Sequence, residues 1–160
     1  NIAGKQYFQY TAIDCASRWR HLAIYEAQTN DHSLKFLKEV IGVFKYTIRA
    51  IKTDNGSIFT NYYTGANKRS DMTVKTLHAL DIFCGEQGII HYLIDPGKPA
   101  QNGKVERSHR SDQETIYDEK EYKTITGLKK KIKYWNIEYN NLEHCGLNGL
   151  TPNEALIIAN

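Results

Sequence analysis

The order of strand-like and helix-like segments constrains the fold of this chain more than any other feature. Two segments rich in aromatic and β-branched residues, Tyr7–Asp14 and His21–Tyr25, come first and are separated by a polar turn. After them, segments of helical character alternate with two short strand-like runs, Ile48–Thr53 and Ile89–Ile94. A hairpin followed by alternating helices and strands predicts an α/β fold, with a mixed sheet flanked by helices.

Four segments have the pattern of helices. We expect Asp31 to cap the first of them, whose apolar residues recur at steps of three and four. Further helices are predicted over Met72–Gln87, over Asn102–Tyr117 with Asn102 as the N-cap, and over Thr126–Asn141. The last helix carries a stripe of apolar residues that we expect to face the core: Leu128, Ile132, Trp135, Tyr139 and Leu142.

Length and composition suit one ordinary globular domain, which we predict over residues 1–160. No apolar run approaches the length of a membrane span. The net charge of 21 − 18 = +3 is mild, so charge alone gives little indication of nucleic-acid binding. The three cysteines are scattered and lack zinc-ligand spacing, which favours reduced thiols in the cytoplasm. Since the chain begins with Asn1 instead of Met, we expect it to be a fragment of a longer protein.

Two carboxylates stand out by their context. Asp54 follows a strand-like run and is itself followed by Asn-Gly, whereas Glu106 lies in the first turns of a predicted helix, with basic residues around it. Carboxylates on two separate rigid elements suit divalent metal ions that act on a phosphodiester. Each also has a simpler interpretation: Asp54 in a tight turn, and Glu106 in an exposed pair with Arg110.

These motifs carry a resemblance to a known family. The combination of Thr-Asp-Asn-Gly at positions 53–56 with Pro-Ala-Gln-Asn-Gly-Lys-Val-Glu-Arg at positions 99–107 resembles the catalytic core of retroviral-type integrases and insertion-sequence (DDE) transposases. The segment Gly149–Leu156 is similar to the one that closes many bacterial members. The resemblance implies a ribonuclease H-like fold, with Asp54 and Glu106 as catalytic ligands of Mg²⁺ or Mn²⁺. Their separation, 106 − 54 = 52 positions, is long for the family, and the polar stretch within residues 61–87 is the expected insertion.

The resemblance also implies a third carboxylate, in the middle of the first strand of the family fold. Asp14 is the obvious candidate. However, Asp-Cys-Ala-Ser-Arg at positions 14–18 resembles the turn after the second strand of the family, and only two strand-like runs precede Asp31 where the family has three. We therefore expect the first strand and its Asp to lie upstream of Asn1, which would leave an unpaired sheet edge in this fragment. Asp14 as the first ligand remains the alternative.

Polar and basic residues near the two carboxylates are candidate DNA contacts. On the helix of Glu106, Arg110 and Gln113 follow at i+4 and i+7 and share its face, which meets phosphates in the resembled family. A solvated helix face is an equally good explanation for them, and the lysines at 129–131 and 133 fit a solvated helix back. The full candidate set is Asn55, Lys98, Gln101, Asn102, Lys104, Arg107, Arg110 and Gln113.

For the full-length protein, the resemblance implies DNA transposition or integration by metal-dependent phosphodiester cleavage and strand transfer. Recognition of the element ends would belong to an upstream DNA-binding domain, and this fragment alone is expected to be inactive. The competing hypothesis is a catalytically inactive ribonuclease H-like module for DNA binding or assembly. A ribonuclease H-type nuclease fits less well, because the segment at 99–107 is integrase-like. Expected partners are DNA (element ends and target) and further copies of the chain, with no membrane, in a bacterial cytoplasm.

Overall fold

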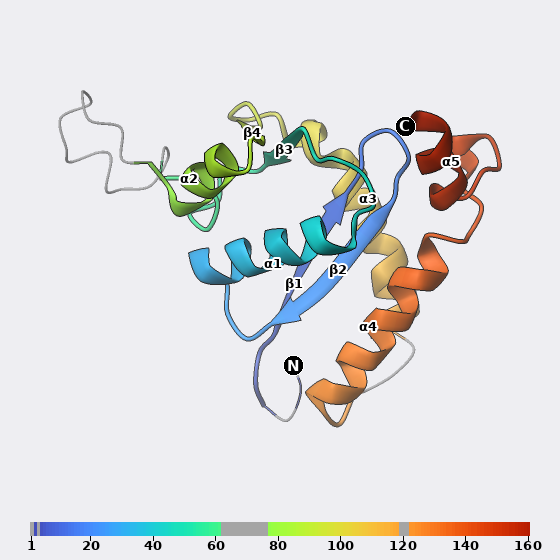
Figure 1. Ribbon diagram of the computed structural model, residues 1–160. Helices are drawn as coiled ribbons and strands as arrows, with labels where there is room; N and C mark the ends of the chain where they lie inside the picture. The colour runs from blue at the N-terminus through green and yellow to red at the C-terminus, as the bar shows by residue number, and fades with distance from the viewer. Residues whose placement is uncertain (1, 3, 62–76, 119–121) are drawn as a thin grey trace. The chain divides into compact units, whose positions relative to one another are not determined.

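The computed structural model describes residues 2, 4–61, 77–118 and 122–160 (Figure 1). The chain divides into two compact units, one formed by residues 1–27 and 104–160 and the other by residues 28–103. The first unit contains β1 (Phe8–Ile13), β2 (Arg20–Tyr25), α3 (Gly103–Asp112, whose first residue belongs to the other unit), η2 (Gln113–Tyr117), α4 (Ile125–Tyr139), η3 (Cys145–Leu147) and α5 (Pro152–Ala159). The second contains α1 (Asn30–Val43), β3 (Ala50–Thr53), α2 (Ala79–Glu86), β4 (Ile90–Leu93) and η1 (Pro99–Asn102).

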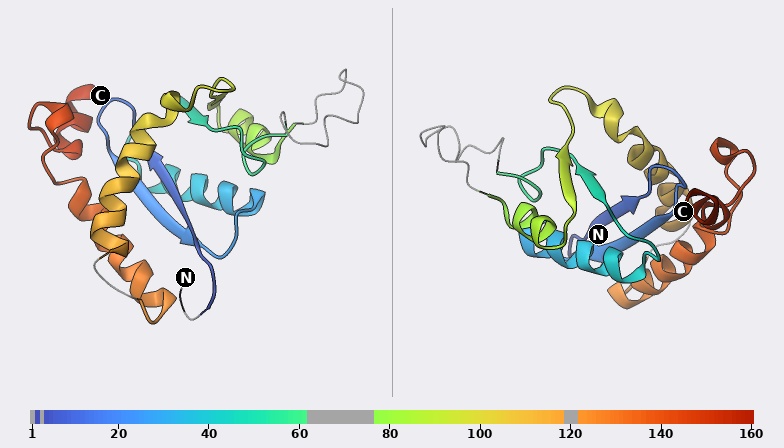
Figure 2. Two further views of the ribbon diagram at one scale, coloured as in Figure 1. Left: turned by 180° about the vertical axis from the view of Figure 1, so that it is seen from behind. Right: turned by 45° about the horizontal axis from the view of Figure 1, so that its top comes forward.

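The first unit is built on an antiparallel hairpin, in which Phe8 lies opposite Tyr25 and Ile13 opposite Arg20. Helical segments from the C-terminal part of the chain cover one face of this hairpin (Figure 2). There, Leu22 and Ile24 pack against a cluster of buried side chains: Ile2, Ile116, Leu128, Ile132, Trp135 and Tyr139. The predicted apolar stripe of the last helix is therefore confirmed, except that Leu142 lies beyond α4 and is 45% exposed.

Two asparagines, Asn136 of α4 and Asn140 at its C-cap, satisfy the backbone of β2 along the edge that faces away from β1. The Asn140 side chain accepts from the Arg20 N–H and donates to the Arg20 carbonyl, both at 2.8 Å. One turn earlier, Asn136 does the same for Leu22, with both distances at 2.9 Å. An unpaired strand edge would otherwise present free donors and acceptors. Side-chain amides of the helix thus take the place of a neighbouring strand.

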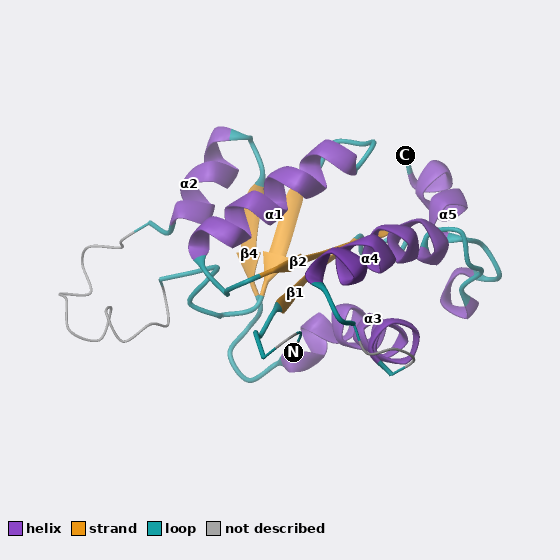
Figure 3. Cartoon of the chain, turned by 90° about the horizontal axis from the view of Figure 1, so that it is seen from below, coloured by secondary structure: helices purple, strands orange, loops and turns teal. Residues whose placement is uncertain are grey.

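The second unit pairs β3 with β4 in parallel, with Ala50 opposite Ile90 and Thr53 opposite Leu93. Helices α1 and α2 pack together with one face of this pair (Figure 3). The buried centre consists of Leu37, Leu80, Cys84 and Ile89. Because the strands are parallel, their carboxyl ends lie at the same edge, which carries Asp54 after β3 and Asp95 two residues after β4.

Several predicted helix boundaries differ from those observed. Thr29, not Asp31, caps α1, since its hydroxyl accepts from the His32 N–H at 3.2 Å, while Asp31 lies in the first turn. Of the helix predicted over 72–87, residues 72–76 lie outside the described residues and α2 begins only at Ala79, because His78 and Asp81 form a capping box. The third predicted helix is α-helical only to Asp112 and continues as a π-helical turn in η2.

Among the described residues, two strands precede α1, as the sequence predicted. The hairpin β1–β2 and the parallel pair β3–β4 form separate two-stranded sheets. None of the helices in the described part of the chain combines the length and the apolar character that crossing a bilayer would require.

Candidate metal and DNA site

Asp54 is held in an exposed turn at the carboxyl end of β3. Its Oδ1 accepts a hydrogen bond from the Gly56 N–H at 2.8 Å. A Cβ at position 56 would lie only 2.9 Å from this oxygen, so a larger residue there would displace the Asp54 carboxylate. The turn expected from Asp-Asn-Gly is thus present, and it orients the Asp54 carboxylate while leaving it open to solvent.

Asn55 joins the ends of the two parallel strands. Its side-chain Nδ2 donates to the Ile94 carbonyl at 3.1 Å, beside the bond from the Ile94 N–H to the Thr53 carbonyl at 3.0 Å. Its Oδ1 is buried and has no hydrogen-bond partner among the described residues. The Asn55 amide nitrogen therefore has a structural role, while its oxygen is an acceptor that no described residue donates to.

The loop after β4 is ordered around Asp95. Gln101 accepts from the Asp95 N–H at 3.0 Å and donates to its carboxylate at 2.9 Å, and Lys98 Nζ lies 3.1 Å from the same carboxylate oxygen. The hydrogen bond from Gln101, followed by that from Lys98, lowers the pKa of Asp95. Two candidate DNA contacts, Lys98 and Gln101, thus hold the loop in shape at the edge that bears Asp54.

Glu106 is exposed in the first turn of α3, where a carboxylate is favoured by the helix dipole. The simpler interpretation, a pair with Arg110, is wrong, because Arg110 Nε lies 3.1 Å from Glu114 instead. Lys104 donates to the Cys15 carbonyl at 2.7 Å. The other candidates divide as follows: Arg107 is exposed, Gln113 donates to Asp118 at 2.6 Å, and Asn102 directly precedes α3, with its side chain outside the described residues.

The two candidate metal ligands belong to different units, Asp54 to that of residues 28–103 and Glu106 to the other. Carboxylate oxygens are hard donors that suit Mg²⁺ or Mn²⁺, so the chemistry of each residue fits such an ion. Within the described residues, however, no group of three or more acidic, histidine or cysteine side chains is placed to hold a metal. Their convergence on one centre therefore stays a prediction.

Asp14 is occupied in the turn between β1 and β2. Its Oδ2 accepts from both the backbone N–H and the hydroxyl of Ser17, each at 2.7 Å. Arg18, next in the turn, has a positive φ of 64°. These contacts give Asp14 a structural role in the turn.

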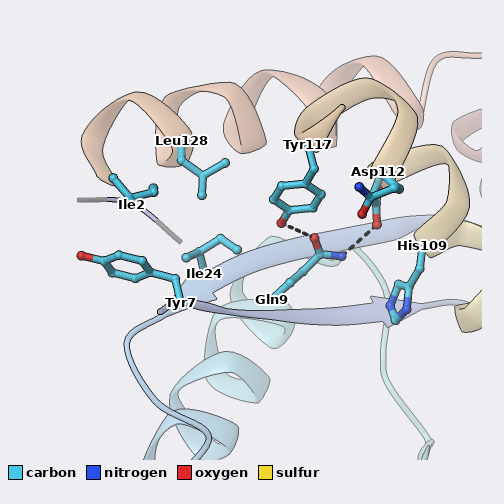
Figure 4. A pocket seen from close by; sticks show the side chains of 9 residues that line it. Ile2, Tyr7, Gln9, Ile24, His109, Asp112, Tyr117 and Leu128 are labelled. Carbon is cyan, nitrogen blue, oxygen red and sulfur yellow. Dashed lines mark hydrogen bonds between the residues drawn. The ribbon is translucent and has the colours of Figure 1, made fainter. Parts of the chain in front are cut away.

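Sequence reasoning missed a buried polar network beneath α3. The Arg20 guanidinium and Asp112 form an ion pair at 2.7 Å, with both side chains almost fully buried. Trp135 Nε1 donates to the same carboxylate at 2.8 Å. On its other side, Gln9 donates to Asp112 and accepts from the Tyr117 hydroxyl (Figure 4). These three residues line part of a hollow of about 380 Å³. The network joins the hairpin to α3, η2 and α4.

Comparisons with known proteins identify the family. Two family models, each described as an integrase core domain, match residues 1–99 and 87–152. The first covers more than half of the chain and includes Asp54, and the second includes Glu106. The chain therefore belongs to the integrase core domain family, a family of DNA integration and transposition whose members generally use divalent metal ions.

Relatives and solved structures agree with this assignment. The chain is 29% identical over 153 residues to "Putative integrase ORF3" of Spiroplasma virus SpV1-C74, covering 92% of this chain and 41% of that protein. It is 28% identical over 107 residues to the "Insertion element IS407 uncharacterized 31.7 kDa protein" of Burkholderia multivorans, covering 66% and 33%. The chain thus spans less than half of each relative.

The catalytic core domain of BIV integrase has a similar structure, with a TM-score of 0.67 at 19% identity over 94% of this chain and 86% of that one. The similarity confirms the predicted ribonuclease H-like α/β fold.

Proposed function

We propose that the full-length protein moves DNA by metal-dependent phosphodiester cleavage and strand transfer, and that this chain is its catalytic core. The observation that carries the proposal is the Asp54 turn: an exposed carboxylate, anchored by the Gly56 amide at a strand end, in a chain of the integrase core domain family. Asp54 and Glu106 would bind Mg²⁺ or Mn²⁺. When bound, two such ions would activate the attacking water or 3′-hydroxyl and stabilise the leaving oxygen.

The chain's own residues would position the DNA. Lys98 and Gln101 border the Asp54 edge, while Lys104, Arg107 and Arg110 lie on the helix of Glu106. Cationic side chains bind phosphates without reading sequence. Gln113, Asn102 and Asn55 are the remaining proposed contacts.

A third carboxylate would complete the centre. Since Asp14 holds the Ser17 turn and only two strands precede α1 in the described residues, we place this carboxylate on a strand upstream of Asn1. An upstream DNA-binding domain would recognise the element ends, and the protein would act as a homo-oligomer in the bacterial cytoplasm.

Substitution of the proposed ligands in the full-length protein tests the function. Asp54→Asn and Glu106→Gln should each lower Mg²⁺-dependent cleavage of DNA that carries the element ends by about 100-fold or more, because each removes several kcal/mol of transition-state stabilisation. Glu138→Gln, an exposed carboxylate on α4 in the same unit as Glu106, is the control and should retain activity.

The outcomes separate the alternatives. Asp14→Asn should leave activity near that of the parent protein if the third ligand is upstream, whereas a loss as large as that of Asp54→Asn would make Asp14 the ligand. Full activity of Asp54→Asn and Glu106→Gln would contradict the proposal. A parent protein that binds DNA but never cleaves it would favour an inactive assembly module.

A further inference from the structure

In the second unit, three side chains form a hydrogen-bonded series that ends next to the backbone of Asp54. His91 Nδ1 lies 2.6 Å from the Asp81 carboxylate, and its Nε2 lies 2.9 Å from the Thr53 hydroxyl. The His91 side chain is only 4% exposed, while that of Asp81 is 34% exposed. The three residues come from the first turn of α2, from β4 and from the last position of β3.

The register of the strands explains why these side chains meet. Ile51 lies opposite His91 and Thr53 opposite Leu93, so Thr53 and His91 point to the same face of the parallel pair. That is the face on which α2 packs. Asp81 occupies the third position of α2, where its second oxygen accepts from the His78 N–H at 3.2 Å and completes the capping box. One carboxylate thus fixes both the start of α2 and the ring of His91.

Hydrogen counting indicates which ring nitrogen of His91 donates. An ionised carboxylate can only accept, so the short contact with Asp81 places a proton on His91 Nδ1. In the neutral ring, Nε2 is then an acceptor and faces the Thr53 hydroxyl. That hydroxyl also lies 3.0 Å from the Asp54 carbonyl oxygen, so its one hydrogen has two acceptors, one of which is the backbone of the proposed metal ligand.

We propose that Asp81, His91 and Thr53 form a positioning relay that holds the Asp54 turn in the orientation needed for metal binding. The inference rests on the proposed function in one respect, that Asp54 is a metal ligand. In many metal centres a carboxylate orients a ligating histidine through a hydrogen bond. Here the histidine would act one step further back, through the hydroxyl of the residue that precedes the ligand.

The same residue types form hydrolase triads, but the environment of Thr53 favours a structural role. Its hydroxyl is directed at a main-chain carbonyl, and the histidine beside it is buried. A nucleophile needs an open approach to its substrate. The relay instead ends at Asp54, whose carboxylate is the exposed group.

Two substitutions at position 53 separate the hydroxyl from the packing of the side chain. Thr53→Val keeps the shape and removes the hydroxyl, whereas Thr53→Ser keeps the hydroxyl and removes the methyl group. In the full-length protein, Thr53→Val should lower kcat for DNA cleavage and the affinity for Mn²⁺ on the order of 10-fold, with the KM for DNA unchanged. Thr53→Ser should behave like the parent protein, as should Thr47→Val, an exposed control in the same unit.

A loss in Thr53→Ser as large as in Thr53→Val would show that packing matters and would overturn the relay. Unchanged kcat and Mn²⁺ affinity in Thr53→Val would do the same. His91→Ala should reproduce Thr53→Val and abolish the downfield proton resonance that a strong Nδ1–H bond to Asp81 produces. Absence of that resonance in the parent protein would contradict the Asp81–His91 contact.

A readout without metal separates failure of the relay from failure of the proposed function. The Gly56 amide, bonded to Asp54 Oδ1, should exchange with solvent roughly 5- to 10-fold faster in Thr53→Val and at the parent rate in Thr53→Ser, because one hydrogen bond contributes about 1 kcal/mol. If the parent protein never cleaves DNA, the proposed function fails while this exchange still tests the relay. Equal exchange in all three proteins would overturn it.

Discussion

At the scale of single residues, burial distinguishes two carboxylates that look equivalent in the sequence. Asp112 and Glu114 are two positions apart, and each pairs with an arginine. Asp112 is 1% exposed and holds Arg20 and Trp135, whereas Glu114 is 62% exposed beside Arg110. Burial lowers the pKa of Arg20, and the charge of Asp112 opposes that shift, which keeps the guanidinium cationic inside the core.

Removal of the buried partner should therefore be far more damaging than removal of the exposed one. We expect Asp112→Ala to lower the free energy of unfolding by about 3–5 kcal/mol, because it leaves the Arg20 charge unpaired in the interior. Glu114→Ala should change it by less than about 1 kcal/mol. Urea denaturation followed by circular dichroism measures both, and a similar loss in the two variants would contradict the role of burial.

The cysteines should differ in the same way. Burial raises the pKa of the Cys84 thiol to about 11, and the side chain is 1% exposed, whereas Cys15 and Cys145 are exposed. The neutral thiol of Cys84 should stabilise the fold below the unfolded value of about 8.5, and this contribution should be lost as the pH rises through about 11.

Iodoacetamide at pH 8, with mass spectrometry as the readout, should therefore modify two thiols quickly and Cys84 only after unfolding. Rapid modification of all three in the native protein would show that Cys84 is accessible.

At the scale of elements, side-chain amides on a helix replace a strand. Asn136 lies on α4 and Asn140, four positions later, is the C-cap of this helix, so the two project from one face. They meet Leu22 and Arg20, which are two positions apart on β2. Four helical residues rise by about 6 Å, which is close to the rise of two strand residues, about 6.6 Å. This match explains how one helix face serves alternate residues of the strand.

Removal of the Asn140 side-chain amide should show how much the stability of the protein depends on its bonds to β2. Asn140→Leu should destabilise the protein by about 1–3 kcal/mol, because the buried N–H and carbonyl of Arg20 lose their partners. Glu138→Ala, an exposed position on the same helix, is the control and should have little effect. Thermal unfolding and the exchange of the Arg20 amide measure the difference, and an unchanged Arg20 exchange rate in Asn140→Leu would contradict the role of the amide.

At the scale of the whole molecule, the candidate ligands are divided between two units. Two divalent ions carry four positive charges, which two carboxylates do not balance. The 160-residue chain by itself should therefore neither cleave nor join DNA with Mg²⁺, whereas the full-length protein should do both. Gel assays with DNA carrying the element ends compare the two, and efficient strand transfer by the short chain would mean that it holds a complete centre.

Local patterns in the sequence were enough to predict much of this molecule. Aromatic and β-branched runs predicted β1 and β2, helical periodicity predicted the buried face of α4, and Asp-Asn-Gly predicted the turn after β3, because each depends on neighbours within a few positions. Family motifs then predicted the fold, which the structural similarity confirms.

Tertiary structure alone decided which distant groups meet. Arg20 and Asn140 are 120 positions apart, and Thr53 reaches His91 across 38. Such contacts depend on strand register and on the face that a helix turns toward a sheet, and no local pattern encodes either. The sequence therefore determined the elements and the turn that presents Asp54, while packing decided which polar side chains hold those elements together.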